Sequence, residues 1–325
     1  MREGSGCVAR PECDPTTPAR QHGTLDEVSR AGSPFTGAPL SVRTRRFVLL
    51  GDLQRTSMLE LFREQNDPER RVIVGAVARE DVDFVALLGD LVFRGDDATD
   101  WARFDALAAP LRERPLFSVL GNHDYGLLAG RARAEFFARF PHLPRRGWSS
   151  IAYGPLLLVL LDSNRMRLSR SEWSTQLGWL EETLASADAD PAVRGVLVLS
   201  HHPPYTNSRV TGDDRDVQRD FVPVFSRARK TRAMISGHVH AYERFVRDGK
   251  AFVVSGGGGG PRAPLHEGAR RRHLDDRFTG KSPRPFHYLR ITLESAALAV
   301  DVIGSDKGGV TMRTLDAFTL PLADS

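Results

Sequence analysis

The stretches Gly121-Asn122-His123-Asp124 and Gly237-His238-Val239-His240 each follow directly after a short apolar run that is typical of a β-strand. Such a strand delivers its last residue to the edge of a sheet, and a glycine there allows a sharp turn. Three more segments share this pattern: 47–52 (FVLLGD), 84–90 (FVALLGD) and 196–204 (VLVLSHHPP). The sequence therefore predicts an α/β fold in which imidazole, amide and carboxylate groups converge above one sheet edge.

Any one of these segments has an ordinary structural explanation. An aspartate after a strand usually forms a turn or caps a helix, and a lone histidine usually satisfies a local hydrogen bond. Five such strand ends in one chain are harder to explain in that way. Their residue types are those that bind transition metals, so the pattern indicates a metal site.

The order of these motifs along the chain resembles the calcineurin-like metallophosphoesterases. The motifs are, in order, Asp52, Gly89-Asp90, Gly121-Asn122-His123-Asp124, His201 and Gly237-His238-Val239-His240. The segment 238–244 (HVHAYER), together with 201–205 (HHPPY), is most similar to the purple acid phosphatase branch and its bacterial relatives. The resemblance covers roughly residues 46–260.

The remaining periodicity predicts two sheets rather than one. Helices are expected at 131–140 and 171–184, and after the first strand, where Pro68 would mark a break. Strand signals outnumber what one doubly wound sheet needs, and they occur at 156–161, 196–199, 233–235, 251–254, 288–293 and 298–303. The resemblance implies the same result, a four-layer α/β/β/α sandwich of two mixed sheets flanked by helices.

Composition divides the chain into a tail and one domain. Residues 1–42 are rich in Gly, Pro, Ser, Thr and Arg and lack periodicity, which predicts a disordered tail, and residues 43–325 are expected to form a single metallophosphoesterase domain. Both cysteines, Cys7 and Cys13, lie in this tail, so no disulfide framework is expected in the domain. The first ten residues lack the apolar stretch of a secretory signal, which favours a cytoplasmic protein. Members of the resembled branch are often exported, so a mis-assigned start codon would leave export open.

The charge balance argues against a nucleic-acid partner. The formal net charge is +4, and 45 basic residues less four lysines leave 41 arginines. Neither a basic stripe interleaved with aromatic residues nor a nucleic-acid module is evident, and no apolar run is long enough to span a membrane. The expected partner is a small phosphoester, while the sequence says nothing of the oligomeric state.

The resemblance implies a centre of two metal ions, with Mn, Fe or Zn favoured by the mixed oxygen and nitrogen ligands. The ligand assignment that follows from the matched motifs is Asp52 and His240 on the first metal, Asp90 as the bridge, and Asn122, His201 and His238 on the second. Two positions depart from the family pattern. Gln54 stands where many metallophosphoesterases have histidine, and its amide oxygen is expected to bind the first metal only loosely. Phe93 stands where purple acid phosphatases have a metal-binding tyrosine, so we expect iron-loaded protein to lack their colour.

Five further residues are expected to act on the substrate, either directly or through a neighbouring side chain. The resemblance gives His123 the task of stabilising or protonating the leaving oxygen, and Asp124 is expected to orient His123. The residues expected to contact substrate are His202, Tyr205 and Arg244, although Arg244 could equally form a structural ion pair with Glu243 or Asp248. The glycine run 256–260 is expected to pack close to the metals. The polar segment 262–286 is interpreted as a basic lid or as a solvated insertion, and the composition favours the solvated insertion.

These features together predict a metal-dependent phosphoesterase in which hydroxide activated by two metals hydrolyses a phosphomonoester. Two alternatives stay open. The same ligands serve a phosphodiesterase acting on a cyclic nucleotide or a phospholipid-type diester. Gln54 and Phe93 also leave room for a phosphate-binding or regulatory protein in which the weakened first metal site no longer supports turnover.

Overall fold

The computed structural model describes residues 1, 34–37, 39–57, 62–278 and 280–324. Within them, the first sheet has six strands in the order β12-β11-β10-β1-β2-β3. The bounds are β1 Arg46–Leu50, β2 Phe84–Leu87, β3 Leu116–Ser118, β10 Phe286–Leu293, β11 Ala297–Ser305 and β12 Arg313–Pro321. Strands β1, β2 and β3 are parallel, whereas β10, β11 and β12 add on in antiparallel fashion, so the sheet is mixed.

The second sheet also has six strands among the described residues, in the order β4-β5-β6-β7-β9-β8. The bounds are β4 Ser149–Tyr153, β5 Leu156–Leu160, β6 Gly195–Ser200, β7 Thr231–Ser236, β8 Tyr242–Arg247 and β9 Lys250–Ser255. Strands β5, β6, β7 and β9 are parallel, and the edge strands β4 and β8 are antiparallel to their neighbours. Two mixed sheets are therefore present, as the sequence predicted.

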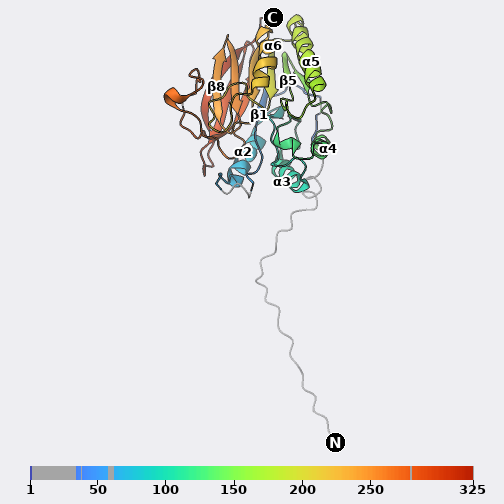
Figure 1. Cartoon of the computed structure of the whole chain (residues 1–325), viewed down its shortest axis with the longest axis vertical. Coiled ribbons are helices and arrows are strands. Elements are labelled where there is room, and N and C mark those ends of the chain that lie inside the picture. The colour runs from blue at the N-terminus through green and yellow to red at the C-terminus, as the bar shows by residue number, and fades with distance from the viewer. Residues whose placement is uncertain (2–33, 38, 58–61, 279, 325) are drawn as a thin grey trace.

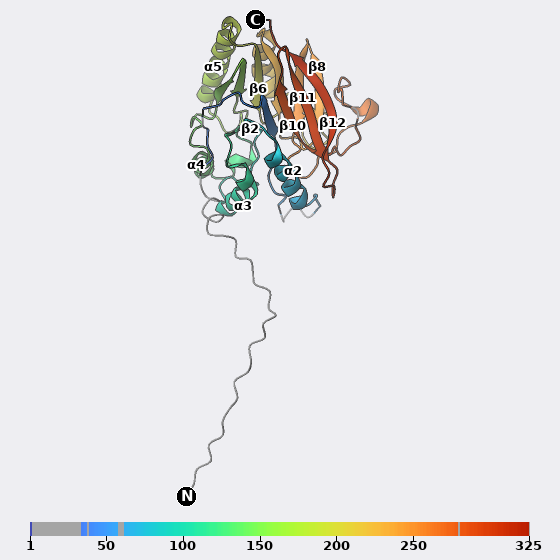
Figure 2. The ribbon, with the colours of Figure 1, turned by 180° about the vertical axis from the view of Figure 1, so that it is seen from behind.

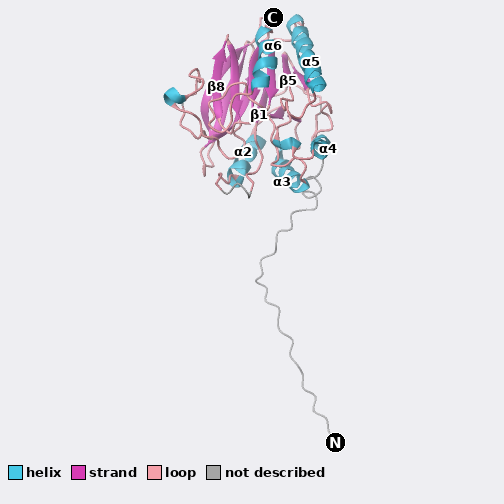
Figure 3. Cartoon of the chain, viewed as in Figure 1, coloured by secondary structure: helices cyan, strands magenta, loops and turns pink. Residues whose placement is uncertain are grey.

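Helices flank the pair of sheets (Figure 3). The longer ones are α2 Asp67–Arg79, α3 Ala98–Ala108, α4 Ala129–Arg139, α5 Arg170–Ala189 and α6 Val222–Arg227, and the short turns are η1 Ala109–Leu111, η2 His123–Tyr125, η3 Val217–Phe221 and η4 Gly268–Arg270. Helices α5 and α6 lie in front of the second sheet in Figure 1, and the view from behind in Figure 2 presents β10, β11 and β12 of the first sheet. Within the described residues, no helix combines the length and the apolar character needed to cross a membrane.

Side-chain alternation along the strands explains the layers. On β6, Leu197 and Leu199 point into the core between the two sheets, whereas Val196 and Val198 join the cluster that α5 and α6 cover. All four side chains are buried, because both faces of this strand are covered. Helices α2, α3 and α4 contribute to the core that contains the first sheet. The predicted sandwich of two mixed sheets flanked by helices is therefore confirmed.

Pro68 has a different role from the one that the sequence suggested. Helix α2 begins at Asp67, and Pro68 occupies its first turn. Proline is well tolerated there, because the first backbone N–H groups of a helix have no partner within the helix. Pro68 therefore starts a helix instead of breaking one.

The predicted tail, 1–42, lies mostly outside the described residues, and so do both cysteines. Phe35, however, is only 2% exposed, and its ring stacks on that of Phe140 with 5.2 Å between centroids. The next residue, Thr36, accepts a hydrogen bond of 2.9 Å from the backbone N–H of Leu116. Packing on the domain thus includes residues that the prediction had assigned to the tail.

Candidate metal centre

The parallel strands of both sheets end on the same side of the sandwich, and the loops that follow them contact one another across the two sheets. The backbone N–H of His238, after β7, donates to both carboxylate oxygens of Asp52, after β1, at 3.0 Å each. Likewise His201, after β6, has its Nδ1 2.8 Å from the carbonyl oxygen of Leu88, after β2. The motifs that the sequence analysis singled out are therefore brought together across the two sheets.

Three of the predicted ligands have an uncommon backbone conformation. Asp52, Asp90 and His238 have φ values of 63°, 54° and 66°, which lie in the left-handed region that residues other than glycine rarely adopt. Such conformations cost free energy and cluster where surrounding structure enforces them for function. Each of the three residues follows a glycine at a strand end. The local strain is the cost of placing these side chains above the sheet edge.

Close backbone approach explains two of the glycines. A Cβ atom on Gly121 would lie 2.2 Å from the backbone nitrogen of Asp90, and one on Gly237 would lie 2.6 Å from Asp52 Oδ2. Neither position has room for a side chain. The glycines therefore allow the loops after β1, β2, β3 and β7 to pack directly against one another.

The residues predicted for the first metal form one cluster. His240 Nε2 lies 3.4 Å from Asp52 Oδ1, and the Gln54 amide nitrogen lies 3.0 Å from His240 Nε2 and 3.3 Å from Asp90 Oδ2. The other ring nitrogen of His240, Nδ1, donates to the carbonyl oxygen of Pro261 at 2.8 Å. That hydrogen bond leaves the lone pair of Nε2 directed at the cluster, which is how metal-binding imidazoles are usually oriented.

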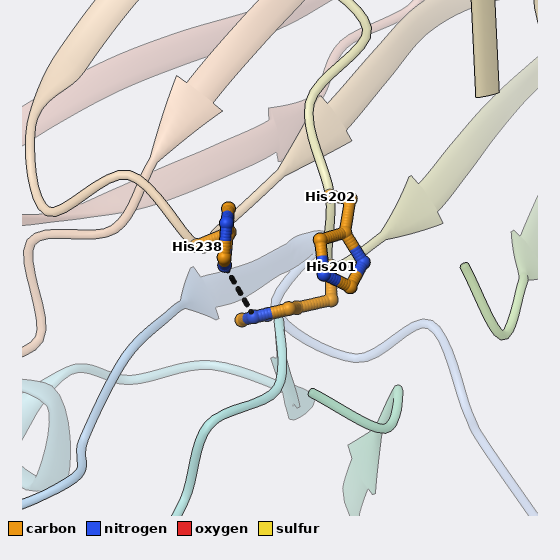
Figure 4. Close-up of side chains that lie close together, drawn as sticks. All are labelled: His201, His202 and His238. Carbon is orange, nitrogen blue, oxygen red and sulfur yellow. Dashed lines mark hydrogen bonds between the residues drawn. The ribbon is translucent and has the colours of Figure 1, made fainter. Parts of the chain in front are cut away.

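The residues predicted for the second metal converge on His201. Its Nε2 lies 3.3 Å from Asp90 Oδ2, 3.1 Å from Asn122 Oδ1 and 3.2 Å from His238 Nδ1. Figure 4 shows the imidazoles of His201, His202 and His238 gathered from two loops, with the contact between His201 and His238 drawn as a dashed line. One Asp90 oxygen thus contacts both clusters, as expected of a bridging ligand.

Electrostatics at the cluster favour a bound cation. Burial by itself would raise the pKa of Asp90, but the imidazoles of His201 and His123 hold it well below its usual range. Burial opposes charge on His201 too, yet Asp90 and Asp52 raise its pKa to about 9. Burial and the neighbouring His201 lower the pKa of His238 to about 3. A metal ion between these groups would replace the proton that His201 otherwise holds.

Gln54 supplies a further sign that the residues fit a metal. Its Oε1 atom is buried and has no hydrogen-bond partner among the described residues. A half-turn of the amide group exchanges Oε1 and Nε2, which directs the oxygen at Asp90 and His240. The centre then presents carboxylate, amide and imidazole ligands only, a set suited to Mn, Fe or Zn. Two groups of three have their ligand atoms within 4.8 Å of one another: Asp52, Asp90 and His201, and also His201, His202 and His238.

Sequence comparison agrees with this geometry. The family model described as calcineurin-like phosphoesterase matches residues 45–242, which is more than half of the chain. The chain belongs to this family. The description of the family names enzymes that act on phosphoester bonds.

Individual relatives support the purple acid phosphatase-like branch. Purple acid phosphatase 22 of Arabidopsis thaliana is 27% identical over 267 residues, which cover 78% of this chain and 56% of the relative. A probable cyclic nucleotide phosphodiesterase of Rhodopseudomonas palustris is 30% identical over 207 residues, covering 59% of this chain and 70% of the relative. The solved structure of purple acid phosphatase PPD1 from yellow lupin seeds has the same fold, with a TM-score of 0.68 at 20% identity, over 88% of this chain and 55% of that one. The chain spans just over half the length of these two purple acid phosphatases.

The orienting role predicted for Asp124 is wrong. Asp124 is fully buried and accepts hydrogen bonds from the backbone N–H groups of Gly121, Asp90 and Leu91 at 2.8 to 2.9 Å. The Nδ1 atom of His123 instead lies 2.7 Å from the carbonyl oxygen of Phe93. The N–H of Val92 donates to Asp124 as well, at 3.4 Å. Because a carboxylate with these N–H donors is already satisfied, Asp124 joins two metal-binding loops rather than orienting the imidazole.

Arg244 does not lie where a phosphate contact would need it. It pairs with Asp316 on β12 at 2.9 Å, and its guanidinium stacks over the ring of Phe318 at 4.7 Å. The structural ion pair considered from the sequence is therefore real, although the partner is neither Glu243 nor Asp248. The predicted contact between Arg244 and substrate is wrong, because this side chain spans the two sheets.

The remaining predicted substrate contacts are divided. Tyr205 packs against Arg247, whose Cζ atom lies 3.6 Å from the centroid of the tyrosine ring. Tyr205 is not among the described residues that line the metal cavity, which corrects its predicted role. His202 lies beside the centre, with ring centroids 4.5 Å from His238. Its contact with substrate stays a prediction. Phe93 packs against His123, with 5.0 Å between ring centroids.

Ser163 is a residue that the sequence analysis missed. Its buried Oγ accepts N–H groups from His201 at 3.2 Å and His202 at 2.9 Å, and it also lies 2.9 Å from His202 Nδ1. With two backbone donors on Oγ, the hydroxyl proton is directed at His202 Nδ1. Ser163 follows β5 at the same sheet edge, so the strand-end pattern that found the ligands could also have found it.

Helix α2 braces the loop between two of the predicted ligands. The buried Arg70 donates through Nε to the carbonyl oxygen of Leu53 at 2.8 Å, and its other end pairs with Asp67 at 2.7 Å. Leu53 separates Asp52 from Gln54. The backbone that carries both side chains is thus fixed by a helix outside the centre.

Exchange of Gln54 for histidine tests whether the first metal is held loosely. Imidazole is a stronger ligand for Mn, Fe or Zn than an amide oxygen, so Gln54→His is expected to tighten binding of the more weakly held metal by on the order of tenfold. Metal titration against a chelator measures this. The matched control is Gln65→His, because Gln65 is exposed on the surface. Equal affinities in the wild type and Gln54→His would show that residue 54 is no ligand.

His287 contacts the glycine run 256–260, and its burial makes the stability of the domain depend on pH. Its backbone N–H donates to the carbonyl oxygen of Gly257 at 2.9 Å, and its buried Nε2 has no partner among the described residues. Burial lowers the pKa of His287 from 6.5 to about 4. As the pH falls below 6.5, His287 therefore takes up a proton in the unfolded chain while it stays neutral in the folded protein.

Because of His287, the free energy of unfolding is expected to fall by about 3 kcal/mol between pH 6.5 and pH 4. Above pH 6.5 the contribution of His287 to stability is complete. Denaturant unfolding between pH 7 and 4 should show a shallower pH dependence for His287→Gln than for the wild type. His266→Gln provides the control for loss of a half-buried imidazole elsewhere in the domain. Parallel pH profiles for the wild type and His287→Gln would contradict the assignment.

Proposed function

We propose that this chain is a metal-dependent phosphoesterase that hydrolyses a phosphomonoester. The observation that carries the proposal is the position of Asp90, whose Oδ2 lies 3.3 Å both from Gln54 in one ligand cluster and from His201 in the other. Two cations held by these clusters would neutralise the charge of the phosphate and activate water. The predicted ligands are Asp52, Gln54 and His240 on one side, Asn122, His201 and His238 on the other, and Asp90 between them.

His123 is the group that we assign to the leaving oxygen. It lines the cavity above the centre, and its backbone N–H donates to Asp90 Oδ1 at 2.8 Å, which fixes its position relative to the ligands. Because Nδ1 faces the carbonyl oxygen of Phe93, that nitrogen carries a proton, and Nε2 is the ring atom left for the substrate. Nε2 of the protonated ring can then donate a proton to the oxygen that leaves with the alcohol.

The test is hydrolysis of p-nitrophenyl phosphate by metal-stripped protein, with and without added manganese. We expect turnover that depends on the metal and falls on the order of a hundredfold or more in His123→Ala. His266→Gln is the control, because His266 is half-buried and is not among the described residues that line the cavity. Absence of turnover with every metal, in protein shown to be folded, would contradict the proposal.

A diester substrate is the second candidate, favoured by the likeness to a probable cyclic nucleotide phosphodiesterase. Parallel assays with p-nitrophenyl phosphate and bis-p-nitrophenyl phosphate separate the two. A higher kcat/KM on the monoester supports the proposal, and the reverse order supports the alternative. Phosphate binding without turnover of either compound would instead indicate a binding or regulatory protein.

A further inference from the structure

A cavity of about 370 Å³ opens above the metal centre. Its floor contains His123 and the predicted ligands Gln54, Asp90, His238 and His240. Beyond this floor the lining residues come from three loops, 62–64, 208–211 and 261–264, with Pro283 beside them. A phosphate bound at the floor would therefore direct the organic part of its ester at these loops.

The loop 208–211 presents an apolar side chain to the cavity. Val210 is 52% exposed and lines the mouth. Ser208 Oγ accepts the N–H groups of Val210 at 3.1 Å and of Thr211 at 3.2 Å, so the turn is closed by its own side chain. The exposure of Val210 thus results from a built turn and not from an unstructured segment.

Arg272 braces this loop from behind. Its guanidinium donates to the carbonyl oxygens of Thr206 at 3.1 Å and Thr211 at 2.9 Å, and also to that of Ser208. One side chain therefore holds three backbone acceptors of the same loop. Arg272 belongs to the basic segment 262–286, for which the sequence suggested a lid or a solvated insertion. At this point the segment holds the cavity wall in place.

The facing loop is joined to the first. The N–H of Arg209 donates to the carbonyl oxygen of Pro264 at 2.9 Å, and Ser208 and Leu265 form an isolated antiparallel bridge. Ala263 and Pro264 line the cavity from this side. The two loops form one continuous wall, which we call the Val210 wall and define as residues 208–211 together with 263–264.

Charge at the mouth is largely compensated. Arg262 lines the cavity but forms two contacts with Glu64, at 3.0 and 2.7 Å, and Arg262 in turn lowers the pKa of Glu64. Arg63, the other charged residue among the described lining residues outside the floor, has an interaction partner as well. A substrate with many negative charges would thus find little to bind beyond the metal centre, whereas an apolar group would bury surface against the Val210 wall.

We propose that the Val210 wall receives the alcohol part of the substrate and selects phosphoesters whose alcohol carries an aromatic or other bulky apolar group. This inference rests on the proposed function, since it concerns the same site. Arg272 acts as a positioning residue that keeps the wall in place. Val210 contributes contact area at the mouth.

The test compares benzyl phosphate with ethyl phosphate, two monoesters whose alcohols have similar acidity and differ mainly in apolar size. Manganese-loaded wild-type protein is expected to favour the benzyl ester in kcat/KM by about tenfold, the effect of burying part of one ring. Val210→Ser should reduce this ratio severalfold, mainly through KM. Arg272→Met removes the strut but keeps much of the side-chain volume, and it should reduce the ratio as well.

Val310→Ser is the matched control, because Val310 is 75% exposed and does not line the cavity. Its ratio should equal that of the wild type, and a general loss of stability would not change the ratio in any variant. Hydrolysis of both esters at equal kcat/KM would overturn the Val210 wall while leaving the phosphoesterase intact. If neither ester is hydrolysed, the proposed function fails, and calorimetric binding of benzylphosphonate and ethylphosphonate to manganese-loaded protein still decides the proposal. Equal affinities would overturn it.

Discussion

Asp90→Asn is expected to lower kcat on p-nitrophenyl phosphate by on the order of a thousandfold and to release at least one metal ion. The substitution keeps the size of the side chain but removes the negative charge. Asp90 Oδ2 contacts both ligand clusters, and Oδ1 accepts the backbone N–H of His123. A neutral amide at this position would leave the imidazoles of the centre without their shared counter-charge. Both clusters are therefore affected by one substitution.

Kinetics and metal analysis of the same preparation measure this effect. The control is Asp81→Asn, since Asp81 lies on the surface with 69% of its side chain exposed. Circular dichroism and a thermal melt show whether Asp90→Asn still folds. Turnover and metal content equal to those of the wild type would remove Asp90 from the centre and, with it, the main support for the proposed function.

Asp124→Asn is expected to lower the free energy of unfolding by about 3 kcal/mol and to weaken metal binding. Asp124 is fully buried and accepts four backbone N–H groups, from Gly121, Asp90, Leu91 and, at 3.4 Å, Val92. An amide offers one acceptor oxygen and turns its own N–H groups toward the remaining donors. The loops that follow β2 and β3 would then lose the group that joins them.

Denaturant unfolding of the metal-free and manganese-loaded proteins checks both parts of this prediction. Asp97→Asn is the matched control, because Asp97 caps helix α3 by accepting from Thr99, a task that asparagine performs equally well. Equal loss of stability in the two variants would mean that Asp124 is an ordinary buried carboxylate. Loss of turnover without loss of stability would return Asp124 to a catalytic role.

The sequence predicted the centre better than it predicted the surroundings. Polar residues just after apolar runs pointed to most of the residues that the structure gathers into the two clusters, because such a run and the residues after it are adjacent in the chain. His201 follows a serine rather than a glycine, and Gln54 was assigned from the resemblance to the family. The partner of Arg244, in contrast, is Asp316 on a strand of the other sheet, 72 residues away. No local pattern encodes that pairing.

Adjacency also misled the prediction for Asp124. Its neighbour His123 is close in sequence, but η2 turns the imidazole toward Phe93 and the carboxylate toward the backbone of Asp90. Position along the chain was therefore a poor guide to direction within a tight turn. The same limit applies to Tyr205, whose place beneath Arg247 depends on β8.

The sheet order sets when the centre can form during synthesis. Strand β1, which precedes Asp52, pairs on one side with β2 and on the other with β10, so residues 46–50 lie beside residues 286–293. A nascent chain that has emerged only as far as His240 already contains every predicted ligand, yet β1 still lacks one of its neighbours. Capture of metal by ribosome-bound chains should therefore become stable only after β10 has left the exit tunnel.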